Sequence, residues 1–356
     1  MLLFRVLVFL LGLAVVIRTV MSIIKTFVLP RSANDRLTRI AFLTIRSIFD
    51  LRLHRVTTYA EQDRLMAFYA PISVLALLPF WLALISIGYT GMYWAIGNFT
   101  WLEALRISGS SLLTLGFATA TELPTTFLEF TEATLGLILV ALLIAYLPSM
   151  YAAFQRREAA VALLEVRAGS PPSAVEMIQR FHRIHGLDRL TEVWKTWETW
   201  FVDIEESHTS LAALVFFRSP QPDHSWVTAA GAVLDAASLT RSTVDIPTDP
   251  QADLCIRAGY LALRRIADFF EVEYNPNPKP GDPISITQEE FIEACEQLAG
   301  QGVPLKADQE QAWRDFAGWR VNYDRVLLAL AGLTMAPPAP WSSDRGLVEY
   351  KQVVKK

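Results

Sequence analysis

Residues 110–118 place hydroxyl groups and a glycine in one short stretch. The chain there is Ser-Ser-Leu-Leu-Thr-Leu-Gly-Phe-Ala, ending at Ala118. A cation that enters a pore must exchange its hydration shell for oxygen atoms, and an extended backbone that contains glycine can turn successive carbonyl groups toward one axis. These residue types suit the coordination of a permeating cation, and Ser111–Ala118 is therefore the first candidate site.

Two long uncharged runs flank this segment. Leu65–Leu102 holds 38 consecutive residues without a charge, and Ala133–Gln155 holds 23. About 20 apolar residues cross the hydrocarbon core of a bilayer, so each run can hold a transmembrane helix. Residues 101–112 are amphipathic and predict a half-helix that leads into the candidate site. The chain is 52% hydrophobic with a mean hydropathy of +0.30, which favours a membrane protein.

The segment Phe99–Ala118, with the spans on either side, resembles the pore loop of the potassium-channel superfamily. The filter of that family has the pattern Thr-hydrophobic-Gly-aromatic-Gly, follows Ser or Thr residues, and precedes an inner helix with a glycine hinge. The resemblance covers residues 65–157, and Glu132–Gly136 is similar to the start of the inner helix. It implies a channel and not an enzyme, with no cofactor beyond the permeating cation, K⁺.

The resemblance implies a selectivity filter made by Thr114, Leu115, Gly116, Phe117 and Ala118. Its cation ligands are the carbonyl groups of the first four residues and the Thr114 hydroxyl. The preceding half-helix points its negative C-terminal end toward the pore, which favours a cation there. One loop supplies a quarter of such a ring, and the chain contains no second copy, so the resemblance implies a homotetramer.

Ala118 departs from the family pattern, which has a second glycine at this position. That glycine commonly adopts a backbone conformation that costs an L-residue about 1–2 kcal/mol. Either the outer filter site is reshaped, which gives a weakly selective cation channel, or neighbouring contacts hold the familiar shape. In one interpretation Glu122, Glu129 and Glu132 form an acidic outer mouth. In the other they are solvated or hydrogen-bonded behind the filter.

Gly136 and Pro148 are candidate gating hinges in the last span. Glycine can flex, and proline removes a backbone donor near the predicted cytoplasmic end. A bend at either residue would open or close an inner gate. The alternative is close glycine packing and a proline at a helix end, both of which are common in membranes.

Arginines predict the orientation of the chain. Seven lie between residues 31 and 64, and Arg156–Arg157 follow the last span, whereas residues 98–132 carry one arginine and four glutamates. Basic loops remain on the cytoplasmic side. The sequence therefore predicts a multi-pass protein of the plasma membrane (the bacterial inner membrane), in contact with membrane lipids and with a cytoplasmic C-terminus.

Two N-terminal segments each allow two interpretations. Leu2–Ser22 is interrupted by Arg5 and Arg18, and it either crosses the membrane as a third span or lies on it as an amphipathic helix. Asp35–Arg52 has apolar residues at helical spacing between arginines, which predicts an interfacial helix. The alternative is a solvated loop whose arginines only set the topology.

Composition divides the chain into a membrane part and a soluble part. Lys and Arg outnumber Asp and Glu by 14 to 10 through Arg167, and Asp and Glu outnumber them by 26 to 18 beyond it. An acidic soluble part argues against nucleic acid as a partner. The predicted parts are a transmembrane helix at 1–30, a cytoplasmic interfacial helix or linker at 31–64, the pore module at 65–157, an all-α cytoplasmic domain at 170–335, and a flexible tail at 336–356.

The cytoplasmic part is predicted from helical apolar spacing and carries no recognisable ligand motif. Its two cysteines, Cys255 and Cys295, form neither a disulfide framework nor a zinc motif. Asp203, Glu205, Glu206 and His208 are close enough in sequence to suggest a divalent-ion site, although clustered acids at a helix end are usually solvated. Its predicted helices are Val175–Ile184, Leu187–Ile204, Trp226–Leu239, Ala252–Glu271, Thr287–Leu298 and Asp308–Leu330.

The predicted function is a homotetrameric potassium channel, gated by its inner helices and regulated by an unidentified ligand of the cytoplasmic domain. One alternative is a cation channel with relaxed selectivity, because of Ala118. The alternative from another class is a non-conducting membrane scaffold or receptor whose cytoplasmic domain binds a partner.

Overall fold

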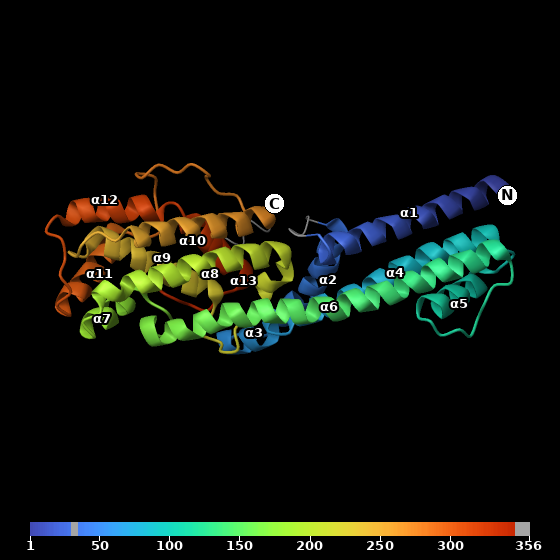
Figure 1. Ribbon diagram of the computed structural model, residues 1–356, viewed down its shortest axis with the longest axis horizontal. Coiled ribbons are helices and arrows are strands. Elements are labelled where there is room, and N and C mark those ends of the chain that lie inside the picture. Colours follow the sequence, from blue (N-terminus) through green and yellow to red (C-terminus); the bar gives the residue numbers. More distant parts are fainter. Residues whose placement is uncertain (30–34, 346–356) are drawn as a thin grey trace. The chain divides into compact units, whose positions relative to one another are not determined.

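The computed structural model describes residues 1–29 and 35–345, which form helices and loops without a strand (Figure 1). One isolated bridge joins Val244 to Leu305. The all-α class is thereby confirmed for the described residues. The chain forms two compact units, one of residues 1–152 and one that begins at Ala153, and helix α6 (Leu123–Ala168) contributes to both.

Three helical stretches are long and apolar enough to span a membrane. They are α1 (Leu2–Phe27), residues Tyr59–Ile96, and α6. The second stretch consists of α3 (Tyr59–Met66) and α4 (Tyr69–Ile96). The first and third predicted spans lie within these stretches, and the run Leu65–Leu102 overlaps the second stretch up to Ile96, which confirms three spans as regards length and composition.

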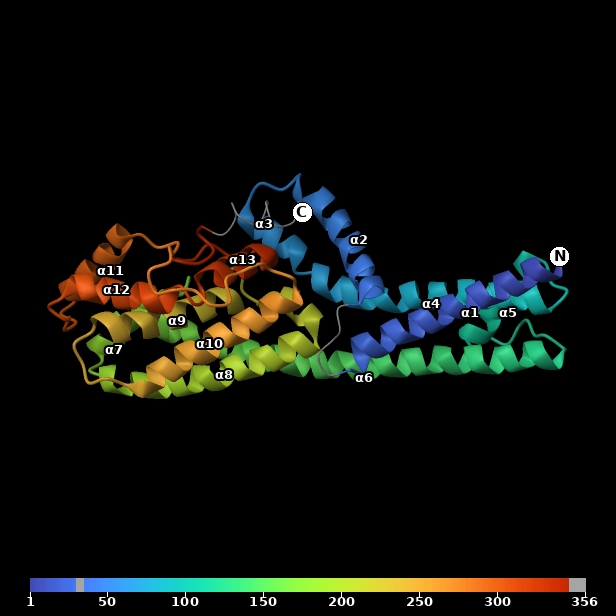
Figure 2. The same cartoon turned by 90° about the horizontal axis from the view of Figure 1, so that it is seen from above.

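Helix α1 packs along α4 in the opposite direction (Figure 2). Phe4 contacts Trp94 at one end of the pair, and Phe27 contacts Trp81 at the other, with ring centroids 5.8 and 5.1 Å apart. Between these ends the backbones meet closely at two glycines, Gly12 and Gly88. These contacts run along almost the whole of α1 and along the later half of α4.

Helix α2 (Arg36–Leu53) follows the segment that lies outside the described residues, which includes Arg31. Its N-cap, Asp35, is buried and accepts hydrogen bonds from the backbone N–H groups of Leu37 and Thr38. Four large apolar side chains of α2 are exposed, and they are Ile40, Leu43, Ile48 and Leu51. The predicted amphipathic helix over residues 35–52 is present.

Helix α5 (Trp101–Leu112) is the predicted half-helix. Thr100 and Glu103 form a capping box at its start, in which each side chain accepts from the backbone N–H of the other residue. The backbone N–H and the hydroxyl group of Thr100 both donate to the Glu103 carboxylate, and these two hydrogen bonds hold the pKa of Glu103 below its usual value.

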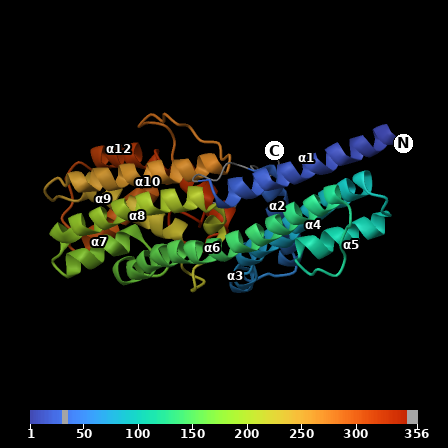
Figure 3. The ribbon, with the colours of Figure 1, turned by 45° about the vertical axis from the view of Figure 1, so that its right-hand side comes forward.

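The second unit is built around α9 (Trp226–Thr243), whose residues are all buried except Arg241. It contacts α7, α10, α12 and α13, and the first three of these are labelled together with α9 in Figure 3. The remaining elements pack around this core. Their bounds are α7 Ala174–Arg183, η1 Leu187–Arg189, α8 Leu190–Ser210, η2 Ala212–Phe216, α10 Pro250–Phe269, α11 Gln288–Gly300, α12 Gln309–Arg320 and α13 Asp324–Thr334.

The single helix predicted over Asp308–Leu330 is wrong, because the chain forms α12 and α13 with a break at residues 321–323. The break lets Arg320 and Tyr323 both reach Asp235 of α9. The Arg320 guanidinium pairs with the Asp235 carboxylate, and the Tyr323 hydroxyl donates to it at 2.8 Å. All three side chains are buried, so this polar contact fixes the break within the core.

The flexible tail predicted from residue 336 is wrong for residues 336–345. Ala339 and Ser342 are buried, and the Trp341 ring packs on Phe316 with centroids 5.6 Å apart. The Trp341 carbonyl accepts a hydrogen bond from Arg320. Apolar burial and this hydrogen bond order a proline-rich segment that lacks helical periodicity. Residues 346–356 lie outside the described part of the chain.

Candidate pore loop

Helix α5 packs against α4, and its last residue lies against α6. The Ser108 hydroxyl lies 2.8 Å from that of Ser86, which is ten residues, or about 15 Å, before the end of α4. The Leu112 carbonyl contacts Gly136, which is thirteen residues, or about 20 Å, into α6. For comparison, the hydrocarbon core of a bilayer is about 30 Å thick, so the distance along α6 at which α5 ends is more than half of that thickness.

The backbone after α5 turns at two residues with positive φ. Gly116 has φ 70° and Thr114 has φ 54°. A β-branched residue rarely adopts this conformation, and such strain costs about 1–3 kcal/mol and concentrates at functional sites. Ala118 is not among the residues with positive φ in the described ranges. The strain expected at Ala118 is therefore absent, and Thr114 carries it instead.

The N–H groups of the loop point back to the last turn of α5. The Thr114 N–H donates to the Ser111 carbonyl at 3.0 Å, and the N–H groups of Leu115 and Gly116 donate to the Ser110 carbonyl at 2.8 and 3.4 Å. The Ala118 N–H donates to the Ser110 hydroxyl at 3.0 Å. Within the described residues, no hydrogen bond reaches the carbonyl oxygens of residues 114–118. The loop thus presents unoccupied oxygen acceptors.

Large apolar side chains of the same loop are exposed. Leu113 is 52% exposed, Leu115 60% and Phe117 59%. Irregular backbone occurs at membrane depth only where protein or a water-filled cavity surrounds it. In a single chain these apolar side chains of the loop are uncovered.

The three glutamates predicted at the outer mouth occupy different environments. Glu122 is exposed. The Glu129 carboxylate accepts a hydrogen bond from the Ala120 N–H at 2.6 Å, and Glu132 is fully buried. Glu129 and Glu132 are hydrogen-bonded, as in the second interpretation. The role of Glu122 at an outer mouth stays a prediction.

Gly136 and Pro148 both lie inside α6, which is helical through Ala168. A Cβ atom at Gly136 would lie 2.1 Å from the Leu112 carbonyl oxygen. Because α6 packs so closely against the end of α5 here, a residue with a Cβ atom would not fit at position 136. The hinge role of both residues stays a prediction.

The acidic cluster suggested for a divalent ion is divided among separate partners. Asp203 pairs with Arg156 at 3.2 Å, and Glu205 pairs with Arg265. His208 is buried and faces Arg157, whose guanidinium lies 3.2 Å from its Nε2 atom. Within the ranges that the structure describes, no three His, Cys, Asp or Glu side chains are grouped as metal ligands.

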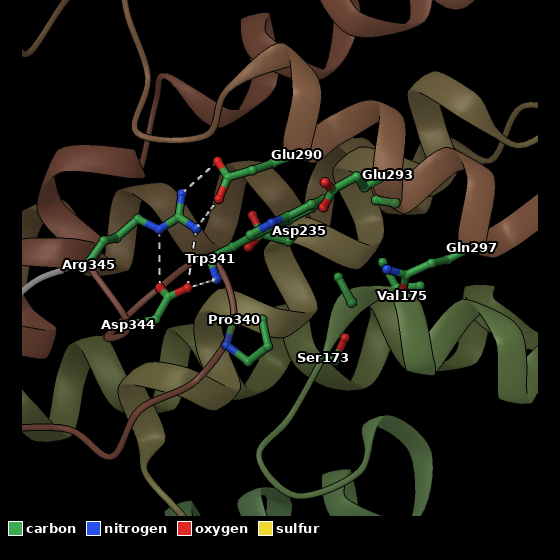
Figure 4. Close-up of a pocket in the computed structure, with 12 residues that line it drawn as sticks. Ser173, Val175, Asp235, Glu290, Glu293, Gln297, Pro340, Trp341, Asp344 and Arg345 are labelled. Carbon is green, nitrogen blue, oxygen red and sulfur yellow. Dashed lines mark hydrogen bonds and ion pairs between the residues drawn. The ribbon is translucent and has the colours of Figure 1, made fainter.

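A cavity of about 260 Å³ in the second unit was not found from the sequence, because its walls come from four separate segments (Figure 4). Arg345 pairs at its rim with Glu290 at 2.7 Å and with Asp344 at 3.1 Å. Burial raises the pKa of Glu290, but the hydrogen bonds from Arg345 and Thr287 outweigh it and lower the pKa. The ligand of this unit stays a prediction.

No protein-family model, curated protein or solved structure matches this chain.

Proposed function

We propose that this chain is one subunit of a homotetrameric cation channel that conducts K⁺ through the loop of residues 114–118. The observation that carries the proposal is the polarity of this loop. Its N–H groups are bound to Ser110 and Ser111, whereas its carbonyl oxygens accept no hydrogen bond within the described residues. Unoccupied carbonyl oxygens at membrane depth are the ligands that a dehydrated cation requires.

The exposed apolar residues of the loop support assembly. Four copies around one axis would cover Leu113, Leu115 and Phe117, which are exposed in a single chain, and would close the ring of carbonyl oxygens. The strained backbone of Thr114 supports a functional loop, because strain of this kind persists where the surrounding structure maintains it.

The continuity of α6 supports the proposed route of gating. The helix begins beside the loop and ends among the core residues of the second unit, where Val161, Leu164 and Ala168 are buried. In the proposed topology this unit lies in the cytoplasm, because arginines flank the inner ends of the spans. A rearrangement of the unit then acts directly on the inner helix.

Ala118 affects the expected K⁺ selectivity. Its backbone lacks the positive φ that would demand glycine, and its N–H is held by the Ser110 hydroxyl. These contacts support an ordered filter with alanine at this position. A weakly selective channel is the competing proposal.

Cation flux from liposomes tests the proposal. Gly116→Ala forces a Cβ into positive φ within the filter, and we expect it to lower the flux at least tenfold. Gly109→Ala is the control, because a Cβ there meets nothing within 4 Å, and its flux should equal that of the wild type. Equal flux through both variants would contradict a filter at residues 114–118.

A further inference from the structure

Glu132 is a fully buried carboxyl group at the junction of α4, α5 and α6. Its Oε1 atom accepts a hydrogen bond from the Ser108 hydroxyl of α5 at 2.6 Å. Its Oε2 atom accepts one from the Tyr93 hydroxyl of α4 at 3.0 Å. The carboxyl group therefore joins the half-helix to the two long helices on either side of it.

No positive charge accompanies this group. Among the described residues, no Lys, Arg or His lies within ion-pair distance of Glu132. The titratable groups that face it are Tyr93 and Tyr89 on α4 and Glu129 one turn earlier on α6, while α5 presents only hydroxyl groups. An unpaired carboxylate is expensive to remove from water, and binding a proton avoids that cost.

The hydrogen bonds around Glu132 suit either protonation state. When the group is ionised, Ser108 and Tyr93 both donate to it, and the Ser86 hydroxyl, 2.8 Å from that of Ser108, can donate to Ser108. When Glu132 carries a proton it can donate to the Ser108 oxygen, and Ser108 then donates to the Ser86 carbonyl, which already lies 3.3 Å away. The proton can be gained or lost without the loss of a partner.

Ser108 also links Glu132 to the loop. It lies two residues before Ser110, whose carbonyl and hydroxyl groups hold the N–H groups of Leu115, Gly116 and Ala118. A change in the Ser108 hydrogen bond acts on the same turn of α5 that holds the loop.

We propose that Glu132 is a proton-binding site behind the pore loop. We propose further that its protonation changes the hydrogen bonds of Ser108 in the last turns of α5. The part that concerns conduction rests on the proposed channel function, and the binding of the proton does not. Cation flux is then expected to depend on pH through this residue.

Infrared difference spectra recorded during a pH titration of the purified full chain test the binding site directly. We expect a carboxylic-acid C=O band that appears as the pH falls, is absent in Glu132→Gln, and remains in Glu206→Gln, which alters an exposed carboxylate. Tyr93→Phe removes one donor and should shift the pH at which the band appears. If Glu132→Gln removes no titrating band, the proposal is overturned. Glu132 would then stay either ionised or protonated over the whole pH range.

Flux measured over the same pH range tests the consequence. We expect the pH dependence of flux to be lost in Glu132→Gln and kept in Glu206→Gln. If the variant keeps the wild-type pH dependence, the link from Glu132 to the loop is wrong. If the infrared band titrates as expected in a protein that passes no cation, the proton site stands and the channel proposal fails.

Discussion

The hydroxyl group of Ser110 accepts a hydrogen bond from the backbone N–H of Ala118 at 3.0 Å. The carbonyl group of the same serine accepts from Leu115 and Gly116. One buried residue at the end of α5 therefore holds Leu115, Gly116 and Ala118, three of the five residues of the proposed filter. This arrangement makes Ser110 the side chain on which the shape of the loop depends most.

Ser110→Ala removes the acceptor for the Ala118 N–H. A hydrogen bond of this kind contributes about 0.5–1.5 kcal/mol, so we expect the K⁺/Na⁺ permeability ratio to fall several-fold as the outer end of the loop loosens. Bi-ionic reversal potentials measure the ratio. Thr119→Ala is the matched control, because its exposed hydroxyl has no partner among the described residues, and the account is wrong here if both variants lower the ratio equally.

Gly136→Ala places a methyl group against the Leu112 carbonyl. Overpacking at a close helix contact costs about 1–3 kcal/mol, and we expect a lower unfolding midpoint in detergent. Gly109→Ala is the control, with open space at the Cβ position. If Gly136→Ala leaves the midpoint unchanged and alters only gating, the glycine acts as a hinge and its close packing is of little consequence.

The spans and the half-helix could be predicted because their signals are local. A long uncharged run and the amphipathic stretch at residues 101–112 give α4 and α5 to within a few residues. The break between α12 and α13 could not be predicted, because it depends on Asp235, which is remote in sequence. The ordering of residues 336–345 depends likewise on a distant partner, Arg320.

The sequence predicted the location of the candidate loop, but it predicted the backbone conformation of the loop only in part. The loop follows α5 where the sequence placed it, but the strained residue is Thr114 and not Ala118. Backbone dihedral angles depend on the contacts of the whole loop, above all on Ser110. The burial of Glu132 depends on α4 and α5 together, so its helix alone did not reveal it.

Arg157→Met should destabilise the second unit strongly. The buried guanidinium donates to the carbonyl groups of Leu214 at 2.8 Å and Phe217 at 2.6 Å, and it pairs with Glu158 at 2.7 Å. Removal leaves these groups without their partner, at a cost of about 3–5 kcal/mol. Denaturant unfolding of the purified chain measures the change.

The adjacent Arg156→Gln is the control for this variant. Arg156 is 57% exposed and pairs with Asp203 at 3.2 Å. A solvated pair of this kind is worth about 0–1 kcal/mol. Similar losses from both substitutions would show that burial of Arg157 is not what stabilises this part of α6.

His208 should make the second unit less stable in acid. Burial, together with the neighbouring Arg157, holds the pKa of His208 well below its usual value of 6.5. The unfolded chain binds a proton at this residue below about pH 6.5, and the folded chain does not. Stability is therefore full above that pH and falls by about 1.4 kcal/mol per pH unit below it.

Unfolding free energies measured against pH, for the wild type and for His208→Gln, test this sign and slope. The wild-type curve should fall more steeply in acid than that of the variant, by the contribution of one proton. His54→Gln alters an exposed histidine and should keep the wild-type slope. Parallel curves for the wild type and His208→Gln would mean that His208 binds a proton in the folded state as well.

We propose above that four copies of this loop form a K⁺-conducting pore. The most direct measurement is the reversal potential of the purified wild-type protein in planar bilayers, with K⁺ on one side and Na⁺ on the other. The account predicts a cation current that reverses close to the K⁺ equilibrium potential. Equal permeability to the two ions would contradict K⁺ selectivity, and a protein that passes no cation current would contradict the channel itself.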